Sequence, residues 1–154
     1  MHPFSATRPP LLVVALGYLG LLPFVGGALS IWVLPLGWRG FVLEALLDYA
    51  AVILAFMGAI HWGLAMRAEH SEGASLQLGF SVIPPLLGWL AIASGMPLLA
   101  ALPLMLVSFV GLYLADLHAV RLGLAPQWYP ALRMPLTAIV SLCLLVAWSS
   151  LLLG

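Results

Sequence analysis

Residues 98–120 read LLAALPLMLVSFVGLYLADLHAV, and Asp116 is the one side chain of this stretch with a formal charge. An α-helix needs about 20 predominantly apolar residues to cross the hydrocarbon core of a bilayer. A helix also satisfies its own backbone hydrogen bonds there, which irregular chain cannot do. The stretch therefore predicts a transmembrane helix that carries one carboxylate near its C-terminal end.

Four further apolar runs accompany this one, and short breaks that carry charge, Gly or Pro separate them. The first run is too long for the apolar region of a secretory signal peptide and no A-x-A pattern follows it, so we expect an uncleaved helix. The sequence predicts an all-α integral membrane protein, a bundle of five transmembrane helices that forms a single domain over residues 1–154. The expected spans are residues 11–34, 43–66, 76–94, 98–120 and 131–153.

The composition supports the same class of protein. Of the 154 residues, 64% are hydrophobic and 6% are charged, whereas about a quarter of the residues of a typical soluble domain are charged. Lysine is absent and the arginines are scattered, so we expect no nucleic-acid partner. Cys143 is the only cysteine, which excludes an internal disulfide and a Cys-based zinc site. The composition indicates a chain that lipid, and not water, surrounds.

The arginines predict the orientation of the bundle. With five spans, Arg8, Arg67, Arg121 and Arg133 fall on the side of the N-terminus, and Arg39 alone falls on the other side. Cytoplasmic segments next to membrane helices carry an excess of positive residues. We therefore expect a cytoplasmic N-terminus and a periplasmic C-terminus.

Prolines interrupt the first and third spans near their middle. Pro23 lies in the first span, and Pro84 and Pro85 lie in the third. Each proline removes a backbone donor and frees a carbonyl one turn earlier, so both helices should kink. Such a pair of interrupted helices fits ordinary packing, since Pro is frequent in membrane helices, and it also fits a substrate cavity near the membrane centre.

Two ionisable residues of different helices are expected at similar depth. With a rise of about 1.5 Å per residue, His61 lies roughly 9 Å from Arg67 along its helix, and Asp116 lies roughly 7–8 Å from Arg121. A buried ionisable group is costly unless it pairs or reaches water. We therefore predict a polar cluster near the cytoplasmic face, in which His61 bonds Asp116 and Arg133 joins them. Such a cluster would lock helices together, carry protons, or bind a lipid head group or a small anion.

His118 is two residues from Asp116, so it should lie on another face of the same helix, toward the head groups. Two histidines on different helices raise the idea of haem ligation by His61 and His118. A haem would need both side chains at one depth and on convergent faces. We expect no resident cofactor.

A pair of carboxylates opens the second span. Glu44 and Asp48 stand one turn apart, where they complement the helix dipole and reach interfacial water. The alternative is a cation or proton site shared with Arg39. The acidic loop of residues 67–75 is interpreted as solvated and lacks the partner ligands that a metal site needs.

Three segments carry a resemblance to a known family. They are LGYLGLLPF (residues 16–24), ILAFMGAIHWG (residues 53–63) and PQWYPALR (residues 126–133). Together they resemble bacterial relatives of the transmembrane protein 69 family, a group defined by a domain of unknown function. The resemblance implies a compact bundle of a kind found in bacterial inner membranes and in mitochondria, and it implies no activity or catalytic residue. It directs attention to four residues, His61, Trp62, Asp116 and Arg133.

No hydrolase, nucleotide-binding or zincin motif is present, so the sequence does not predict an enzyme. Ala51, Ala55, Ala59 and Gly63 recur at every fourth residue and predict one close helix interface. The leading hypothesis is a non-enzymatic inner-membrane bundle that binds membrane lipid or a partner protein, with a homodimer among the candidates. The alternative is a small transporter or proton-coupled carrier that uses the His61/Asp116 pair.

Overall fold

The computed structural model describes residues 8–67 and 73–153 of the chain. Among these residues there is no β-strand, and five helical stretches are long and apolar enough to cross a membrane. The predicted class, an all-α membrane protein with five spans, is therefore confirmed. The acidic residues of the loop after the second span, Glu69 and Glu72, lie outside the described residues.

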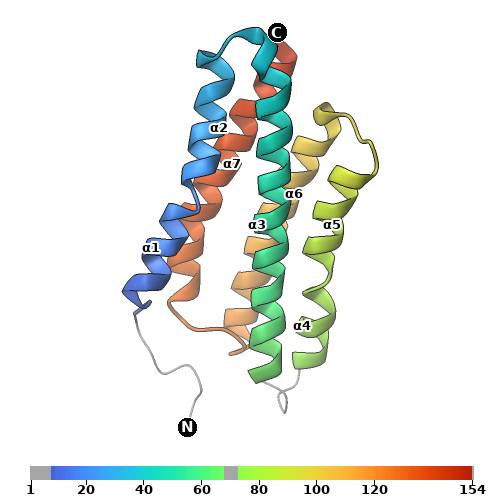
Figure 1. The fold of residues 1–154 in the computed structure, drawn as a ribbon. Helices are drawn as coiled ribbons and strands as arrows, with labels where there is room; N and C mark the ends of the chain where they lie inside the picture. Colours follow the sequence, from blue (N-terminus) through green and yellow to red (C-terminus); the bar gives the residue numbers. More distant parts are fainter. Residues whose placement is uncertain (1–7, 68–72, 154) are drawn as a thin grey trace.

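Two of the five spans consist of two helices each (Figure 1). The first span comprises α1 and α2, and the third comprises α4 and α5. The elements are α1 (Leu11–Leu19), α2 (Leu22–Val33), the short 3₁₀ helix η1 (Leu36–Trp38), α3 (Arg39–Arg67), α4 (Ala74–Phe80), α5 (Ile83–Ala93), α6 (Leu98–Arg121) and α7 (Tyr129–Leu153).

Three helices begin earlier than hydropathy predicts, and one of them, α4, begins at Ala74, two residues before the expected start. The helix α3 begins at Arg39, because η1 leads directly into it. The helix α7 begins at Tyr129, two residues before the expected start. Pro130 does not prevent this, because a backbone N–H in the first turn has no partner within the helix.

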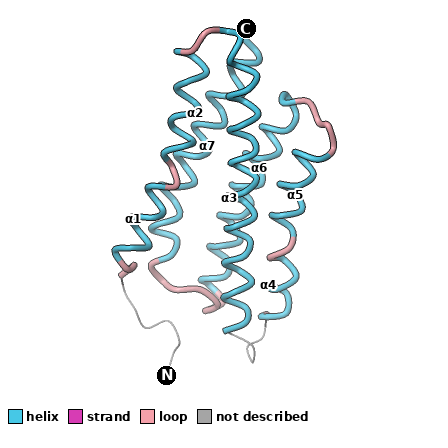
Figure 2. Tube along the Cα trace, in the orientation of Figure 1, coloured by secondary structure: helices cyan, strands magenta, loops and turns pink. Residues whose placement is uncertain are grey.

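The helix α3 stands between the two interrupted spans (Figures 1 and 2). It packs against α2 on one side and against α4 and α5 on the other, and α6 and α7 pack closely together behind it. The start of α1 and the end of α7 lie at opposite ends of the bundle (Figure 1). An odd number of spans requires this arrangement.

Both interruptions lie directly before the prolines that predict them. The turn Gly20–Leu21 separates α1 from α2, in which Pro23 occupies the first turn. The turn Ser81–Val82 separates α4 from α5, in which Pro84 and Pro85 occupy the first turn. A first-turn proline loses no helical hydrogen bond, so the helix restarts there instead of running through.

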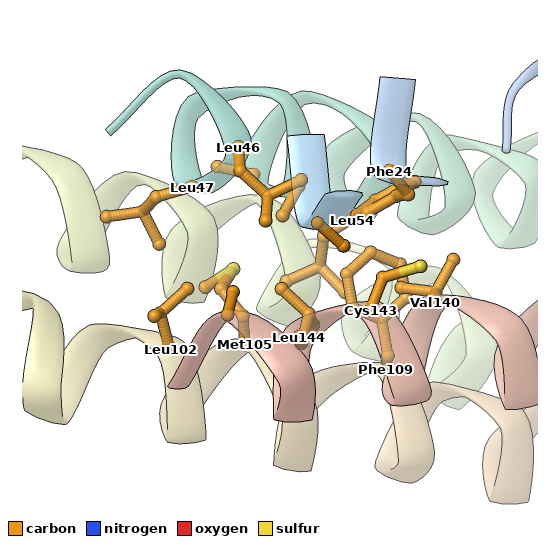
Figure 3. Packing of buried hydrophobic residues seen from close by; sticks show 14 of the residues in the cluster. Phe24, Leu46, Leu47, Leu54, Leu102, Met105, Phe109, Val140, Cys143 and Leu144 are labelled. Atoms are coloured by element: carbon orange, nitrogen blue, oxygen red, sulfur yellow. The ribbon is translucent and has the colours of Figure 1, made fainter. Parts of the chain in front are cut away.

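An apolar core fills the bundle between α2, α3, α6 and α7 (Figure 3). Phe24 packs edge-on against Phe109, with ring centroids 6.0 Å apart. Leu54, Met105 and Leu144 are buried around this pair. The core holds the three uninterrupted helices in fixed register, which positions the polar residues described below.

The third span meets α3 at glycines. A Cβ atom at Gly58 would lie 2.8 Å from the carbonyl oxygen of Ser81 and 2.9 Å from Cδ of Pro85. A Cβ atom at Gly88 would lie 3.1 Å from the carbonyl oxygen of Ala51. Glycine at both positions therefore lets α3 and the α4–α5 turn approach to backbone contact.

Within the described chain, the small residues of α3 do not form one continuous interface with a neighbouring helix. Ala51 is buried against α5, but Ala59 and Gly63 are exposed. Residues four apart drift by about 40° per step around a helix of 3.6 residues per turn. The stripe therefore leaves the interface after Ala51, and Gly58 makes the close contact instead.

Candidate functional site: a buried polar network between two cavities

Four side chains from four helices form one hydrogen-bonded network, which we call the polar network. His61 on α3 bonds Asp116 on α6, with 2.8 Å between Nε2 and Oδ1. Arg133 on α7 donates from Nε to the other carboxylate oxygen, Oδ2, at 2.8 Å. Gln77 on α4 lies against His61, with 3.2 Å between Nε2 and Nδ1. The polar network therefore comprises Gln77, His61, Asp116 and Arg133.

Both ring nitrogens of His61 are engaged, and the placement of the Gln77 amide fits one tautomer of the imidazole. An amide nitrogen only donates, so Nδ1 of His61 accepts from Nε2 of Gln77. The ring hydrogen is then on Nε2, which donates it to Asp116. In this arrangement the imidazole is neutral, and the formal charges of Asp116 and Arg133 cancel.

The polar network is shielded from its surroundings. His61 and Asp116 are each 1% exposed, and Arg133 is 5% exposed. Leaving one charge of such a pair without its partner would cost about 3–5 kcal/mol. A second contact stabilises Arg133, whose Nη1 donates to the sulfur of Met57 at 2.8 Å. The polar network thus fixes the relative positions of α3, α4, α6 and α7.

A first cavity lies on the Arg133 side of the polar network. It has a volume of about 360 Å³, within the range of about 300–1,000 Å³ for small-molecule sites. Helices α1, α2, α3, α6 and α7 all contribute to its wall, which is almost entirely apolar. Representative lining residues are Leu16, Phe24, Phe56, Phe109, Leu136 and Val140.

A second cavity, of about 340 Å³, lies on the other side of the polar network. His61 and Gln77 line it, together with Phe80 of α4 and His118 of α6. Arg133 lines the first cavity, and Asp116 joins Arg133 to His61 between the two. The first cavity therefore borders the interruption of the first span, the second borders α4, and the polar network lies between the two.

Three hydrogen-bond donors at the first cavity have no partner among the described residues. They are Nη2 of Arg133, the hydroxyl of Tyr129 and the hydroxyl of Thr137, which we call the three unpaired donors. All three residues line the first cavity and all three are buried. Most buried polar groups in proteins have a partner, so three exceptions at one cavity need an explanation.

The comparisons with known proteins agree with the resemblance seen in the sequence. Residues 9–149 match the family model described as "Protein of unknown function (DUF3429)". The chain belongs to this family. It is also 35% identical over 128 residues to transmembrane protein 69 of Xenopus tropicalis, covering 80% of this chain. The chain spans about half the length (48%) of that relative. No solved structure matches the chain.

Membership of this family confirms the resemblance seen in the sequence. It also supports the predicted class, a multi-pass membrane protein of a family with unknown function. The family description assigns no substrate or partner. The site must therefore be interpreted from its own geometry.

The structure brings together three of the residues singled out from the sequence, and it separates the others. His61, Asp116 and Arg133 meet in the polar network. Trp62 and His118 are exposed at its margin, although His118 borders the second cavity. His118 thus lies on another face of α6 than Asp116, as their spacing of two residues predicts.

The carboxylates Glu44 and Asp48 are remote from the polar network. Asp48 lies about 20 Å from His61 along α3, at 1.5 Å per residue. Both carboxylates are exposed beside Met96 and Leu98, in keeping with an interfacial position. The structure therefore places them outside the candidate site.

Sequence reasoning missed Gln77, Met57, Tyr129 and Thr137, because only ionisable side chains were screened for depth. Gln77 offered a signal, since an amide inside a membrane span normally bonds across helices. Tyr129 lies outside the expected fifth span, because that span begins at residue 131 and α7 begins at Tyr129. A screen of all polar side chains within the spans would have found Gln77 and Thr137.

Haem ligation by His61 would require one of its two hydrogen bonds to break, because both ring nitrogens are already engaged. Over residues 8–67 and 73–153, no group of three His, Cys, Asp or Glu side chains is arranged to hold a metal ion. The chemistry that the site offers is hydrogen bonding and charge pairing.

Proposed function

We propose that this protein is a non-enzymatic membrane protein that binds a lipid in the first cavity. The observation that carries the proposal is the combination of an apolar cavity of about 360 Å³ with a buried arginine at its wall. An apolar wall suits hydrocarbon, and a few fixed polar groups orient a ligand within such a site.

The first cavity is bordered by side chains at the lipid-facing surface. Leu16 of α1 is 59% exposed and Phe56 of α3 is 60% exposed, yet both line the cavity. A hydrocarbon chain that enters between α1 and α3 stays in an apolar medium throughout. Lateral access from the bilayer therefore needs no aqueous path.

Native mass spectrometry of the protein extracted in mild detergent tests this function. We expect a retained lipid on the wild type and its loss in Leu136→Phe, because the larger side chain occupies the cavity. Leu142→Phe is the matched control, since Leu142 lies on the same helix but is exposed to lipid. The same spectra give the oligomeric state and so test the homodimer and partner hypotheses. A wild type without bound lipid would contradict the proposal.

A second candidate function is a proton-coupled carrier, and the position of the polar network between two cavities favours it. Protonation of His61 would place a hydrogen on Nδ1. The Oε1 atom of Gln77, which has no partner among the described residues, could accept that hydrogen if the amide rotated by 180°. The polar network thus has two hydrogen-bonded states that differ by one proton.

Proton flux into proteoliposomes that contain a pH-sensitive dye tests the carrier. We expect His61→Asn to abolish any flux that depends on the protein, and His118→Asn to leave it unchanged, because His118 is outside the polar network. Equal flux in the His61 variant and the wild type would exclude His61 as the proton carrier.

We further propose a location in the bacterial inner membrane with a cytoplasmic N-terminus. Arg133 is buried against Asp116 and no longer counts as a loop residue. Arg8, Arg67 and Arg121 still outnumber Arg39, so the orientation follows as before. A reporter that is active only in the periplasm should be active when it is fused after Gly154. Activity of a cytoplasmic reporter at the same position would show the opposite orientation.

A further inference from the structure

The three unpaired donors specify the head group of the lipid. Tyr129, Arg133 and Thr137 lie on one face of α7, at successive intervals of four residues, and line the same cavity. Guanidinium N–H groups can only donate, and a hydroxyl group without a partner can donate as well. The three residues form a row about 12 Å long, at 1.5 Å per residue, with Arg133 at its centre, and a row of donors favours a ligand with oxygen acceptors.

We infer that the first cavity binds a single-chain amphiphile whose compact head is a carbonyl or carboxylate oxygen held by Arg133, with Tyr129 and Thr137 as donors on either side of it along α7. This inference rests on the proposed lipid-binding function and adds the chemical class of the ligand. The apolar body of the ligand lies along Leu136 and Val140, and its far end leaves between α1 and α3.

The burial of the three unpaired donors restricts the size of the head. Tyr129, Arg133 and Thr137 line the first cavity and are all buried. A phospholipid head carries more polar atoms than three donors can satisfy, and polar atoms without partners are costly at this depth. A carbonyl or a carboxylate needs only donors, and the site has three of them without a partner in the part of the chain that the structure describes.

The charge of the polar network restricts the charge of the head. Arg133 already shares its positive charge with Asp116 at 2.8 Å. A neutral carbonyl would leave the pair balanced, and a single carboxylate would be balanced if His61 took up a proton. Two negative charges would exceed what Arg133 and His61 can neutralise. The groups that face the head are therefore compatible with a charge of zero or minus one.

Competition for bound radiolabelled palmitate on the purified full chain in detergent tests the inference. The unlabelled competitors are palmitate, a decyl benzoquinone, hexadecane and phosphatidylglycerol. We expect palmitate or the quinone to displace the label, and the stronger of the two identifies the head as carboxylate or carbonyl. Hexadecane and phosphatidylglycerol should displace it at least tenfold less well.

Substitutions that remove only a hydroxyl group keep the test independent of folding. Tyr129→Phe and Thr137→Val each delete one of the three unpaired donors, and we expect each to weaken palmitate or quinone binding by about three- to tenfold. Ser141→Ala is the matched control. The Ser141 hydroxyl also lacks a partner among the described residues, but Ser141 does not line the first cavity.

The outcomes separate this inference from the proposed function. Displacement by hexadecane as strong as that by palmitate, or unchanged binding in Tyr129→Phe and Thr137→Val, would overturn the acceptor head while lipid binding stands. Absence of any bound lipid on the wild type, in the native spectra as well as in this assay, would overturn both. Weakened binding in both variants, with Ser141→Ala unchanged, supports the inference.

Discussion

The two interrupted spans share a local cause and differ in what their first halves contact. Both restart at prolines in the first turn of the second helix, α2 or α5. In the third span, α4 buries Ala74 and Gln77 and contributes to the polar network. In the first span, none of the residues of α1, all of which the structure describes, is buried.

The difference shows that a proline break does not by itself make a cavity. At α4–α5 the break is closed by Gly58, which lets backbone approach backbone. At α1–α2, Gly17 faces the side chain of Leu136, and a Cβ atom added at Gly17 would lie 3.1 Å from Cδ1 of Leu136. The first cavity lies beside this contact. The α4 side thus supplies protein partners for its polar groups, while the α1 side leaves the three unpaired donors.

The largest effect should come from breaking the polar network, which both spans border. Asp116→Ala leaves Arg133 and His61 without their common partner and should destabilise the protein by about 3–5 kcal/mol. Unfolding in mixed micelles measures the change. Asp48→Ala, at an exposed carboxylate of α3, should change stability by no more than about 0.5 kcal/mol. Equal losses in both variants would show that the network contributes no stability.

Replacing both charges sharpens that result. In Asp116→Leu with Arg133→Met, no buried charge is left unpaired, so the double variant should be more stable than Asp116→Leu alone. A double variant less stable than the single one would mean that Arg133 contributes mainly through other contacts.

An intermediate effect should distinguish the two spans at their glycines. Gly58→Ala forces a Cβ atom against the backbone of Ser81 and should cost about 1–3 kcal/mol. Gly17→Ala meets only the end of the Leu136 side chain, which can move into the cavity, so we expect a loss below about 0.5 kcal/mol. Thermal unfolding of the two variants checks this order of stability losses. Gly63→Ala is the control, because a Cβ atom added there meets no described atom within 4 Å. Equal melting temperatures for the Gly58 and Gly17 variants would refute the contrast between the spans.

The smallest effects should differ between the α4 side and the α1 side of the bundle. Gln77→Leu removes the donor to His61 and should destabilise the ligand-free protein by about 1 kcal/mol. Tyr129→Phe removes a hydroxyl that has no partner among the described residues, so it should leave stability unchanged or raise it slightly. Unfolding after removal of bound lipid compares the two, and a loss in Tyr129→Phe as large as that in Gln77→Leu would indicate a protein partner for that hydroxyl.

Much of the fold and half of the site follow from the sequence for physical reasons. Hydropathy locates five spans because the bilayer sets their length. Depth along α3 and α6 brings His61 to Asp116 because the rise per residue is constant. The cavity could not be predicted, since it depends on how closely α1 packs, and no pattern in Leu11–Leu19 encodes that distance.

Photo-crosslinking in membranes tests directly whether lipid occupies the inside of the bundle beside α1. A palmitate analogue with a diazirine along its chain would be activated in membranes that contain the wild-type protein, and the labelled peptides mapped by mass spectrometry. We predict labels on inward-facing residues that line the first cavity, such as Phe24 and Leu136. Labels confined to lipid-facing residues such as Leu142 and Leu145 would contradict the account.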